Sequence, residues 1–288
     1  MSEIKEIQDE IYITNNFKNL VDIYGEIASI RMMKIRTNVL NNRNYIFSIT
    51  QIFFDTLAAF LKKASRATLN EKLFKKNRIT FLSHNGKTVF VLISSNTGFY
   101  GDVNKTTFSK FVNDFDKADC EVTIIGKVGK KLFTDSYPKK PYTFFELPDY
   151  GSDKNSLLAI INHLVQYDEV RVYYSAYTTV LNQSPTMSNL TAGTTLIEKT
   201  KNIKDQYIFE PNVEDILTFF EKEVFGSFFD QTIKESQLSK LSGRIMAMDR
   251  ASISIKNKLR LINYDYLRVK HRQINKKQLG LLQSLVYH

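Results

Sequence analysis

Residues 238–273 read LSKLSGRIMAMDRASISIKNKLRLINYDYLRVKHRQ. Apolar residues recur here at alternating steps of three and four, and nine of the eleven positions in this stripe are apolar: Leu238, Leu241, Ile245, Met248, Ser252, Ile255, Leu259, Ile262, Tyr266, Val269 and Gln273. A 3.5-residue repeat held over this length predicts a left-handed coiled coil, because supercoiling keeps such a stripe facing a partner helix. The fold therefore depends on which segment covers the stripe.

The N-terminal segment is the candidate partner. Ile4, Ile7 and Ile11 have the same spacing. After a shift in register the stripe resumes and then continues more loosely, at Ile13, Phe17, Leu20, Tyr24, Ile27, Ile46, Ile49, Phe53, Leu57 and Leu61. All five prolines lie between residues 138 and 211, so both ends of the chain lack the strongest helix breaker. We therefore expect a helix that runs to about Lys63 and pairs antiparallel with the C-terminal helix.

The middle of the chain alternates between strand and helix patterns. Residues 89–94, 121–125 and 169–174 are β-branched or aromatic runs bounded by turn formers, whereas residues 107–115 and 156–166 have helical spacing. Residues 134–153 and 182–206 are expected to be loops, because they are rich in turn-forming residues. This order predicts a small, mostly parallel sheet with crossover helices.

The predicted fold class is α/β, with a long antiparallel coiled coil of the N- and C-terminal helices and a small Rossmann-like α/β domain mounted on it. The predicted domains are a coiled-coil helix over residues 1–75, the α/β domain over residues 76–211 and a second coiled-coil helix over residues 212–288.

Composition restricts the protein class. With 43% apolar residues the chain can form a real core, and the single cysteine, Cys120, excludes an intrachain disulfide framework and favours a reducing, cytosolic compartment. The first six residues lack the basic and apolar regions of a secretory signal. The most apolar stretch, residues 46–61, is interrupted by Gln51 and Asp55 and is shorter than the roughly 20 apolar residues that a membrane span needs.

The sequence predicts neither an active site nor a cofactor site. Gly86, Lys87 and Thr88 look like the end of a phosphate-binding loop, but the required earlier glycine is replaced by Phe81, and a strand pattern follows instead of a helix. A hairpin or a turn before a strand is the expected structure. The four histidines have no metal-ligand spacing, and no serine lies in a nucleophile elbow. We therefore predict a protein that is not itself an enzyme and binds no metal.

Positive charge is concentrated on the C-terminal helix. The chain carries 40 basic and 30 acidic residues, and ten of the basic residues lie between Arg244 and Lys277, against only Asp249 and Asp265. Such a face could be a solvated coiled-coil surface, a contact with the phosphate backbone of a nucleic acid, or a helix inside an acidic protein collar. Spacing alone leaves these alternatives open.

Short motifs follow one another in a fixed order along nearly the whole chain. They are Lys5, Glu6, Ile7 and Ile11; Ile27, Ala28, Ser29, Arg31, Met32 and Lys34; residues 94–104; Ile125, Gly126 and Gly129; Gln183, Pro185 and Thr186; Phe209, Glu210 and Pro211; and Arg244, Met246, Ala247 and Met248. In this order they resemble the motifs of the gamma subunit of the rotary F-type ATP synthase. The stretch from Ser94 to Asn104, for example, stands in line with that family's Thr-Ser-Asp-Arg-Gly-Leu-Cys-Gly-Gly-Leu-Asn.

The resemblance implies a central rotor shaft that transmits torque. It implies a ring of alternating alpha and beta subunits that binds Mg-ATP or ADP, an epsilon-like subunit, a membrane rotor ring or another coupled assembly, and no nucleic acid. It implies a cytoplasmic location, peripheral on the inner face of the cell membrane. Contacts between shaft and ring are expected at Arg31, Met32, Lys34, Lys240, Arg244, Met246, Met248, Asp249, Lys270, His271, Arg272 and Gln273. The motif of the α/β domain is carried by Ser94, Ser95, Asn96, Gly98, Gly101 and Asn104.

The chain also departs from that family's pattern. Asp249 stands where the family has lysine, and Lys240 stands where it has glutamate. These reversals are typical of a divergent relative, such as the F-type-like ATPases of wall-less bacteria. Within the family, the alternative function is a shaft of an ATP-hydrolysing motor that drives motility. Outside it, the alternative is a coiled-coil protein that binds nucleic acid through its basic helix.

Overall fold

The structure is a computed structural model that describes residues 2–63, 74–75, 78–79, 82, 84–151, 153–190 and 213–286. Its contacts divide the chain into two compact units. The first unit contains Met1–Ile30 and Arg244–His288, and the second contains Arg31–Gly243. The predicted domain boundaries, at residues 75 and 211, adjoin or lie within segments outside the described residues, so the three-domain division stays a prediction.

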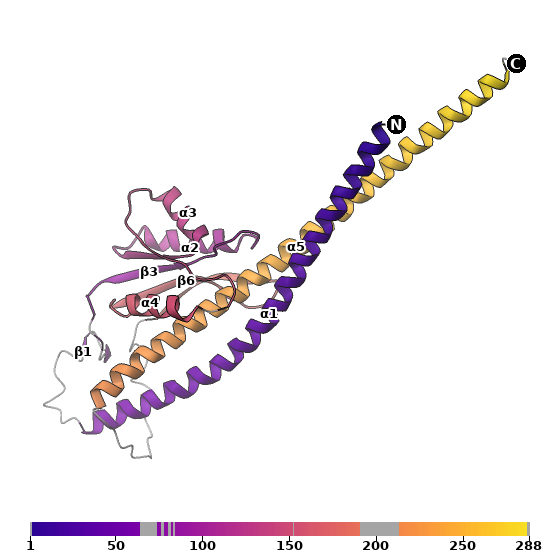
Figure 1. The fold of residues 1–288 in the computed structure, drawn as a ribbon. Helices are drawn as coiled ribbons and strands as arrows, with labels where there is room; N and C mark the ends of the chain where they lie inside the picture. The colour runs from indigo at the N-terminus through magenta and orange to yellow at the C-terminus, as the bar shows by residue number, and fades with distance from the viewer. Residues whose placement is uncertain are drawn as a thin grey trace. The chain divides into compact units, whose positions relative to one another are not determined.

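Both predicted terminal helices are present. Helix α1 covers Ser2–Lys63 and helix α5 covers Val213–Val286. In the first unit they run antiparallel (Figure 1): Gln8 Nε2 donates a hydrogen bond to Tyr266 Oη at 3.3 Å, and Ser252 Oγ donates to Asp22 Oδ1 at 2.8 Å. Lys258 Nζ lies 3.0 Å from Glu10 Oε1. These pairs confirm the predicted antiparallel coiled coil.

The predicted apolar stripe of α5 is confirmed as its contact row, or seam, because all eleven predicted positions are buried or half-buried. The seam of α1 differs from the prediction. Its repeat continues from Ile11 without a shift, through Thr14, Lys18, Val21, Gly25 and Ala28. These five residues are buried or half-buried, whereas their immediate neighbours, except the half-buried Asp22, are exposed. The predicted continuation at Ile13, Phe17, Leu20, Tyr24 and Ile27 is wrong, since these side chains are 40% to 59% exposed. An unbroken heptad repeat can include small and polar residues at some of its contact positions. A shift in the repeat is less favourable, because it would rotate the contact row of α1 away from α5.

Gly25 provides a check on this seam. A Cβ atom built on Gly25 would lie 3.5 Å from Met248 Cβ, an ordinary van der Waals contact. Because glycine inside a helix costs about 0.5–1 kcal/mol relative to alanine, we expect Gly25→Ala to raise the free energy of unfolding by that amount. Urea unfolding followed by circular dichroism measures it. A destabilised variant would contradict the observed register.

The second unit contains a five-stranded sheet. Its strands are β3 (Thr88–Ile93), β4 (Glu121–Ile125), β5 (Thr143–Phe145), β6 (Glu169–Tyr177) and β7 (Gln183–Asn189), in the order β5-β4-β3-β6-β7. All neighbours are parallel except β6 and β7. The helices of this unit are α2 (Val103–Phe115), α3 (Lys127–Ser136) and α4 (Lys154–Leu164). A short antiparallel pair, β1 (Phe74–Lys75) and β2 (Arg78–Ile79), precedes them.

The mostly parallel sheet with crossover helices confirms the predicted class. The predicted ranges of strands β3, β4 and β6 and of helices α2 and α4 agree with the structure within a few residues. The sequence does not predict α3, β5 or β7. The predicted loops 134–153 and 182–206 are wrong in part, because they contain the end of α3, all of β5 and all of β7. Strand β7 is polar and contains Pro185, which is tolerated because β7 is an edge strand with a ladder on one side only. Residues 191–206 lie outside the described residues.

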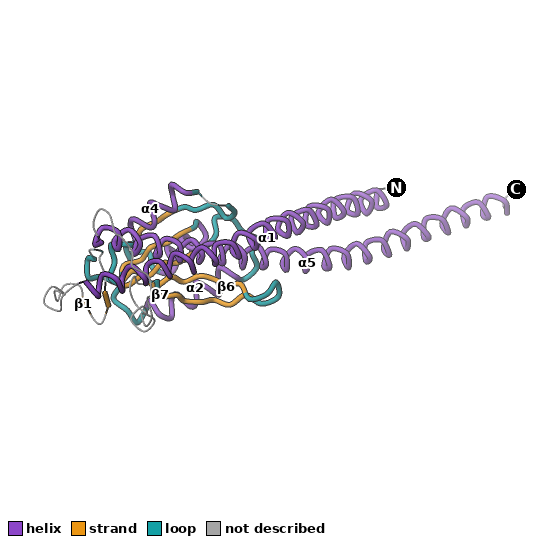
Figure 2. The backbone as a smooth tube through the Cα atoms, turned by 90° about the horizontal axis from the view of Figure 1, so that it is seen from below, coloured by secondary structure: helices purple, strands orange, loops and turns teal. Residues whose placement is uncertain are grey.

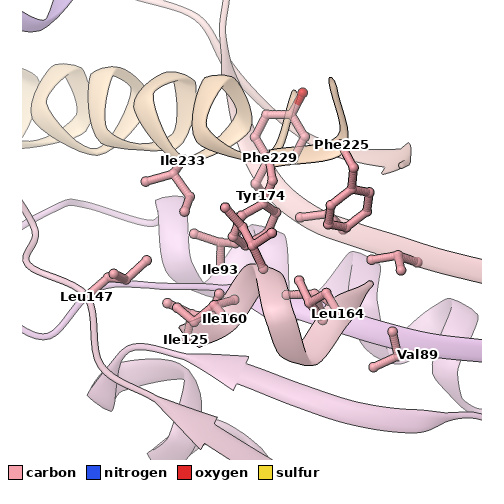
Figure 3. Close-up of a cluster of buried hydrophobic side chains, with 14 of the residues drawn as sticks. Val89, Ile93, Ile125, Leu147, Ile160, Leu164, Tyr174, Phe225, Phe229 and Ile233 are labelled. Carbon is pink, nitrogen blue, oxygen red and sulfur yellow. The ribbon is translucent and has the colours of Figure 1, made fainter. Parts of the chain in front are cut away.

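Each face of the sheet is covered by two helices (Figures 1 and 2). Phe111 of α2 and Phe133 of α3 pack on one face against Phe90 and Tyr173. On the other face, α4 and residues 225–233 of α5 lie against Ile93 and Tyr174 (Figure 3). A segment of the long C-terminal helix is therefore part of the core of the α/β unit.

Candidate functional site

The carboxyl ends of β3 and β6 are where a sheet of this class binds ligands, because the strand order reverses between them. In this protein α5 occupies that crevice. Ser239 Oγ lies 2.6 Å from Ser175 Oγ, and Lys240 Nζ donates a hydrogen bond to the carbonyl oxygen of Ser94 at 3.0 Å. A Cβ atom on Gly243 would come within 2.6 Å of the Tyr100 carbonyl oxygen. Residues 239–243 therefore fill the crevice with the chain's own helix.

The predicted motif over residues 94–104 builds the loop beneath that helix. Ser94 Oγ contacts the carbonyl oxygens of Ile125 and Gly126 at 2.8 and 3.2 Å and accepts a hydrogen bond from Gly129 N at 2.9 Å. Asn104 Nδ2 donates to Ser95 Oγ at 2.8 Å. The loop then turns through positive φ at Phe99 and Gly101, with angles of 67° and 60°. Gly98 lies in open space.

Gly126 and Gly129 are explained by their distance from Ser94. A Cβ atom on Gly126 would lie 2.6 Å from Ser94 Oγ and 2.8 Å from the Ser94 carbonyl oxygen, and one on Gly129 would lie 2.5 Å from Ser94 Oγ. Gly126 also has a φ of 100°, which side chains rarely adopt. Glycine is therefore needed at these two positions so that the chain after β4 can pack closely against Ser94 at the carboxyl end of β3.

Asp149 closes the same loop, and the sequence reasoning missed it. Its carboxylate accepts hydrogen bonds from Asn96 N at 2.8 Å, Thr97 N at 2.9 Å and Thr97 Oγ1 at 2.7 Å. Asn96 adds a hydrogen bond from its Nδ2 to the Leu147 carbonyl oxygen at 2.7 Å. An acid between Pro148 and Gly151 reads as an ordinary turn residue, so no local pattern could have identified it.

Lys240 is the one lysine among the buried polar residues of the described chain, with 4% of its surface exposed. Burial lowers the pKa of its ammonium group from 10.5 to about 8, and the Asp149 carboxylate partly offsets that effect. A charged amine is tolerated here because a carbonyl oxygen accepts its hydrogen bond and an acid lies nearby. The predicted shaft residue therefore contacts the sheet of its own unit.

The other predicted shaft residues divide between buried and exposed positions. In the second unit Met32 is buried with Ser242 Oγ 3.7 Å from its sulfur, the Arg31 guanidinium lies 4.9 Å from the centre of the Tyr150 ring, and Lys34 is exposed. In the first unit Arg244 is buried, and Met246, Met248 and Gln273 are half-buried. Asp249, Lys270, His271 and Arg272 are exposed. Only the exposed members present their side chains to a partner, and their role as ring contacts stays a prediction.

The remaining sequence predictions concern chemistry. Gly86 lies at a bend with a φ of 76°, and a strand, β3, begins at Thr88 where a phosphate-binding loop would need a helix. Among the residues that the structure describes, no three His, Cys, Asp or Glu side chains are grouped so as to hold a metal ion. Within those same residues, no helix combines the length and apolarity needed to cross a membrane.

Comparison with known proteins agrees with this architecture. A family model described as ATP synthase matches residues 3–277. The ATP synthase gamma chain of Protochlamydia amoebophila is 22% identical, with 98% of this chain and 97% of the relative covered. The ATP synthase gamma chain of Mycoplasma capricolum subsp. capricolum is 25% identical, with 96% of each covered.

Solved structures show the same fold. A chain of the Euglena gracilis mitochondrial ATP synthase OSCP/F1/c-ring structure in rotational state 3 aligns with a TM-score of 0.61 at 15% identity, covering 99% of this chain and 94% of that one. A chain of the Tetrahymena thermophila mitochondrial ATP synthase central stalk/c-ring structure aligns with a TM-score of 0.57 at 18% identity, covering 81% and 99%.

Proposed function

This chain belongs to the ATP synthase family and matches its gamma chains along almost their whole length, and on that basis we propose that it is the central rotor shaft of a rotary ATPase. The ring around it consists of alpha and beta subunits that bind Mg-ATP or ADP and carry out the catalysis. An epsilon-like subunit and a coupled device complete the assembly. The complex lies peripherally on the inner face of the cell membrane, and the chain itself transmits torque.

The exposed basic face of α5 is the observation that carries this proposal. Lys270, Arg272, Lys276 and Lys277 are all exposed on the C-terminal part of that helix. Beyond Gln273 the α5 residues up to 283 are exposed, and the end of α5 extends past the start of α1 in both views (Figures 1 and 2). A basic, exposed helix end suits an acidic collar, because complementary charge guides docking without requiring fixed pairs.

Neutralising this face is expected to slow assembly with the ring. We expect replacement of Lys270, Arg272, Lys276 and Lys277 by glutamine to reduce the association rate about tenfold or more at low salt, and the deficit to shrink as salt screens the charges. Stopped-flow mixing of the shaft with purified ring subunits measures it. The control replaces four exposed lysines of the second unit, Lys117, Lys131, Lys139 and Lys154. If the α5 replacements and the control replacements slow association equally, the net charge of the chain, and not the basic face of α5, is responsible.

Purification of the native complex tests the function itself. We expect this chain with two larger nucleotide-binding subunits in excess over it, and ATP hydrolysis by the complex but not by the pure chain. Isolation of the chain alone on DNA, with steep salt dependence, would support the nucleic-acid alternative instead. The identity of the coupled subunits decides between ATP synthesis and a hydrolysis-driven output such as motility.

A further inference from the structure

The second unit contains a cavity between α1, β6, β7 and α5. Its volume is about 440 Å³, within the roughly 300–1,000 Å³ that is typical of small-molecule sites. The described residues that line it are Ile46, Phe47, Thr50, Tyr174, Ser188, Leu190, Phe228, Gln231, Thr232 and Glu235. All of them belong to the second unit, so a ligand bound here would not depend on the first unit.

Glu235 is the only charged residue among these described lining residues, and two chains of hydrogen bonds end on its carboxylate. In one chain, Asn42 Nδ2 donates to Gln231 Oε1 at 3.2 Å, and Gln231 Nε2 donates to Glu235 Oε1 at 2.9 Å. In the other, Ser188 Oγ donates to Tyr174 Oη at 3.3 Å, and Tyr174 Oη donates to Glu235 Oε2 at 3.5 Å. These contacts hold a negative charge in one orientation at the cavity wall.

Three aromatic side chains line the same cavity. Tyr174 is buried, with 6% of its surface exposed, whereas Phe47 and Phe228 are 65% and 41% exposed. The two phenylalanines therefore lie toward the solvent side of the cavity and Tyr174 lies toward the core. The faces of aromatic rings attract cations, because the π electrons give them a negative potential. The rings and the carboxylate of Glu235 thus favour the same kind of ligand, a cation.

The apolar character of the remaining wall indicates which kind of cation fits. A simple ammonium group is strongly hydrated, so its transfer into a site lined by Ile46 and Leu190 is unfavourable. An alkylated ammonium group has apolar methyl groups around its charge, and aromatic side chains are what proteins use to recognise it. We propose that this cavity binds a small alkylated ammonium compound of the choline type, with its methyl groups against the aromatic rings and its charge facing Glu235.

Thr50 offers a further polar contact to such a ligand. Its Oγ1 atom is enclosed and has no hydrogen-bond partner among the residues that the structure describes. An enclosed hydroxyl group without a partner is unfavourable, and threonine in a helix has two accessible rotamers. Rotation about the Cα–Cβ bond lets Thr50 bond the hydroxyl group of a choline-type compound.

Comparison of choline with its uncharged carbon isostere, 3,3-dimethylbutan-1-ol, tests the proposal. The two compounds have nearly the same shape, and only choline carries a charge. We expect choline to bind the purified full chain saturably and at least about tenfold more tightly than the alcohol, as measured by saturation-transfer NMR titration. Equal binding of the two compounds, or no saturable binding of choline, would overturn the proposal.

Two cavity variants locate the bound cation. We expect Glu235→Gln, and separately the joint replacement of Phe47 and Phe228 by leucine, to weaken choline binding at least about tenfold. Glutamine removes the charge, and leucine removes the ring faces but keeps the site apolar. The matched controls on α5 are Glu223→Gln, at a half-buried acid, and Phe219→Leu, at an exposed ring, and neither residue is among the described lining residues. Equal weakening by the controls would contradict a site in this cavity.

Thermal unfolding provides an independent readout. At about tenfold excess over its dissociation constant, choline should raise the unfolding midpoint of the wild-type chain by about 3 °C or more, because it binds only the folded state. Glu235→Gln should show no such rise. An equal rise in both chains would mean that choline acts elsewhere, and would refute the proposal.

A lipid headgroup could supply the same ammonium group as a free compound. Cosedimentation of the chain with phosphatidylcholine vesicles, lost in Glu235→Gln, would support the site with a lipid as its ligand, whereas choline binding without cosedimentation would support it with a free compound. These measurements use the purified chain, so their outcome is independent of whether the chain assembles with a nucleotide-hydrolysing ring.

Discussion

Replacing Gly126 by alanine is expected to lower the free energy of unfolding of the second unit by about 3 kcal/mol or more. The methyl group would lie 2.6 Å from Ser94 Oγ and 2.8 Å from the Ser94 carbonyl oxygen, and the residue would have to keep a φ of 100°. Strained backbone costs about 1–3 kcal/mol, and overpacking costs a similar amount. Ser94 cannot move away easily, because its backbone pairs with β4 through Ile125 and its carbonyl oxygen accepts the hydrogen bond of Lys240.

Gly86 is the matched control for this prediction. It also has a positive φ, 76°, but a Cβ atom built on it meets no atom within 4 Å. Gly86→Ala therefore carries the backbone strain without the collision, and we expect a loss of about 1 kcal/mol. Chemical unfolding of both variants, followed by circular dichroism, gives the comparison. Equal losses would show that the space around Ser94 is not the cause.

Raising the pH from 8 to 10.5 is expected to stabilise the wild-type chain relative to a Lys240→Met variant by up to about 3 kcal/mol. The folded chain releases the Lys240 proton near pH 8, whereas the unfolded chain holds it up to pH 10.5. Between these values the unfolded state binds more protons, so the free energy of unfolding rises with pH, and 2.5 pKa units correspond to about 3 kcal/mol. The gain is complete above pH 10.5 and disappears as the pH falls through 8.

The comparison with Lys240→Met isolates this lysine, because other groups that titrate at high pH, such as Cys120 with its pKa raised by burial to about 11, are common to both chains. The measurement is urea unfolding at a series of pH values. A difference between the two chains that stays constant from pH 8 to 10.5 would mean that Lys240 is solvated in the folded protein.

The sequence predicts the helices α1, α2, α4 and α5 and the parallel strands β3, β4 and β6, because their signals are local. The repeat in α5 and the β-branched runs of β3, β4 and β6 each contain their own periodicity. Strand β7 carries no such signal, since its polar residues are ordered by pairing with β6. The role of Asp149 depends on its hydrogen bonds with Asn96 and Thr97, which lie some fifty residues away in the chain and leave no local pattern around Asp149.

The seam of α1 shows why periodicity alone can mislead. Two rows with the same spacing lie side by side on this helix, and hydrophobicity favours the more apolar row for the contact with α5. The structure pairs α5 with the row that contains Thr14, Gly25 and Ala28 instead. Hydrophobicity identifies a surface that must be covered, but it does not identify the partner that covers it.

The position of residues 239–243 in the crevice of the sheet also has a mechanical consequence. Apolar contacts have no direction, so a helix held by them alone can roll about its own axis with little change in buried area. Hydrogen bonds prefer narrow ranges of distance and angle, and the contacts of Ser239 with Ser175 and of Lys240 with Ser94 penalise such rolling. Within the second unit, these side chains therefore restrict rotation of residues 239–243 about the axis of α5 relative to the sheet, so a torque applied to this segment would pass to the sheet without slip.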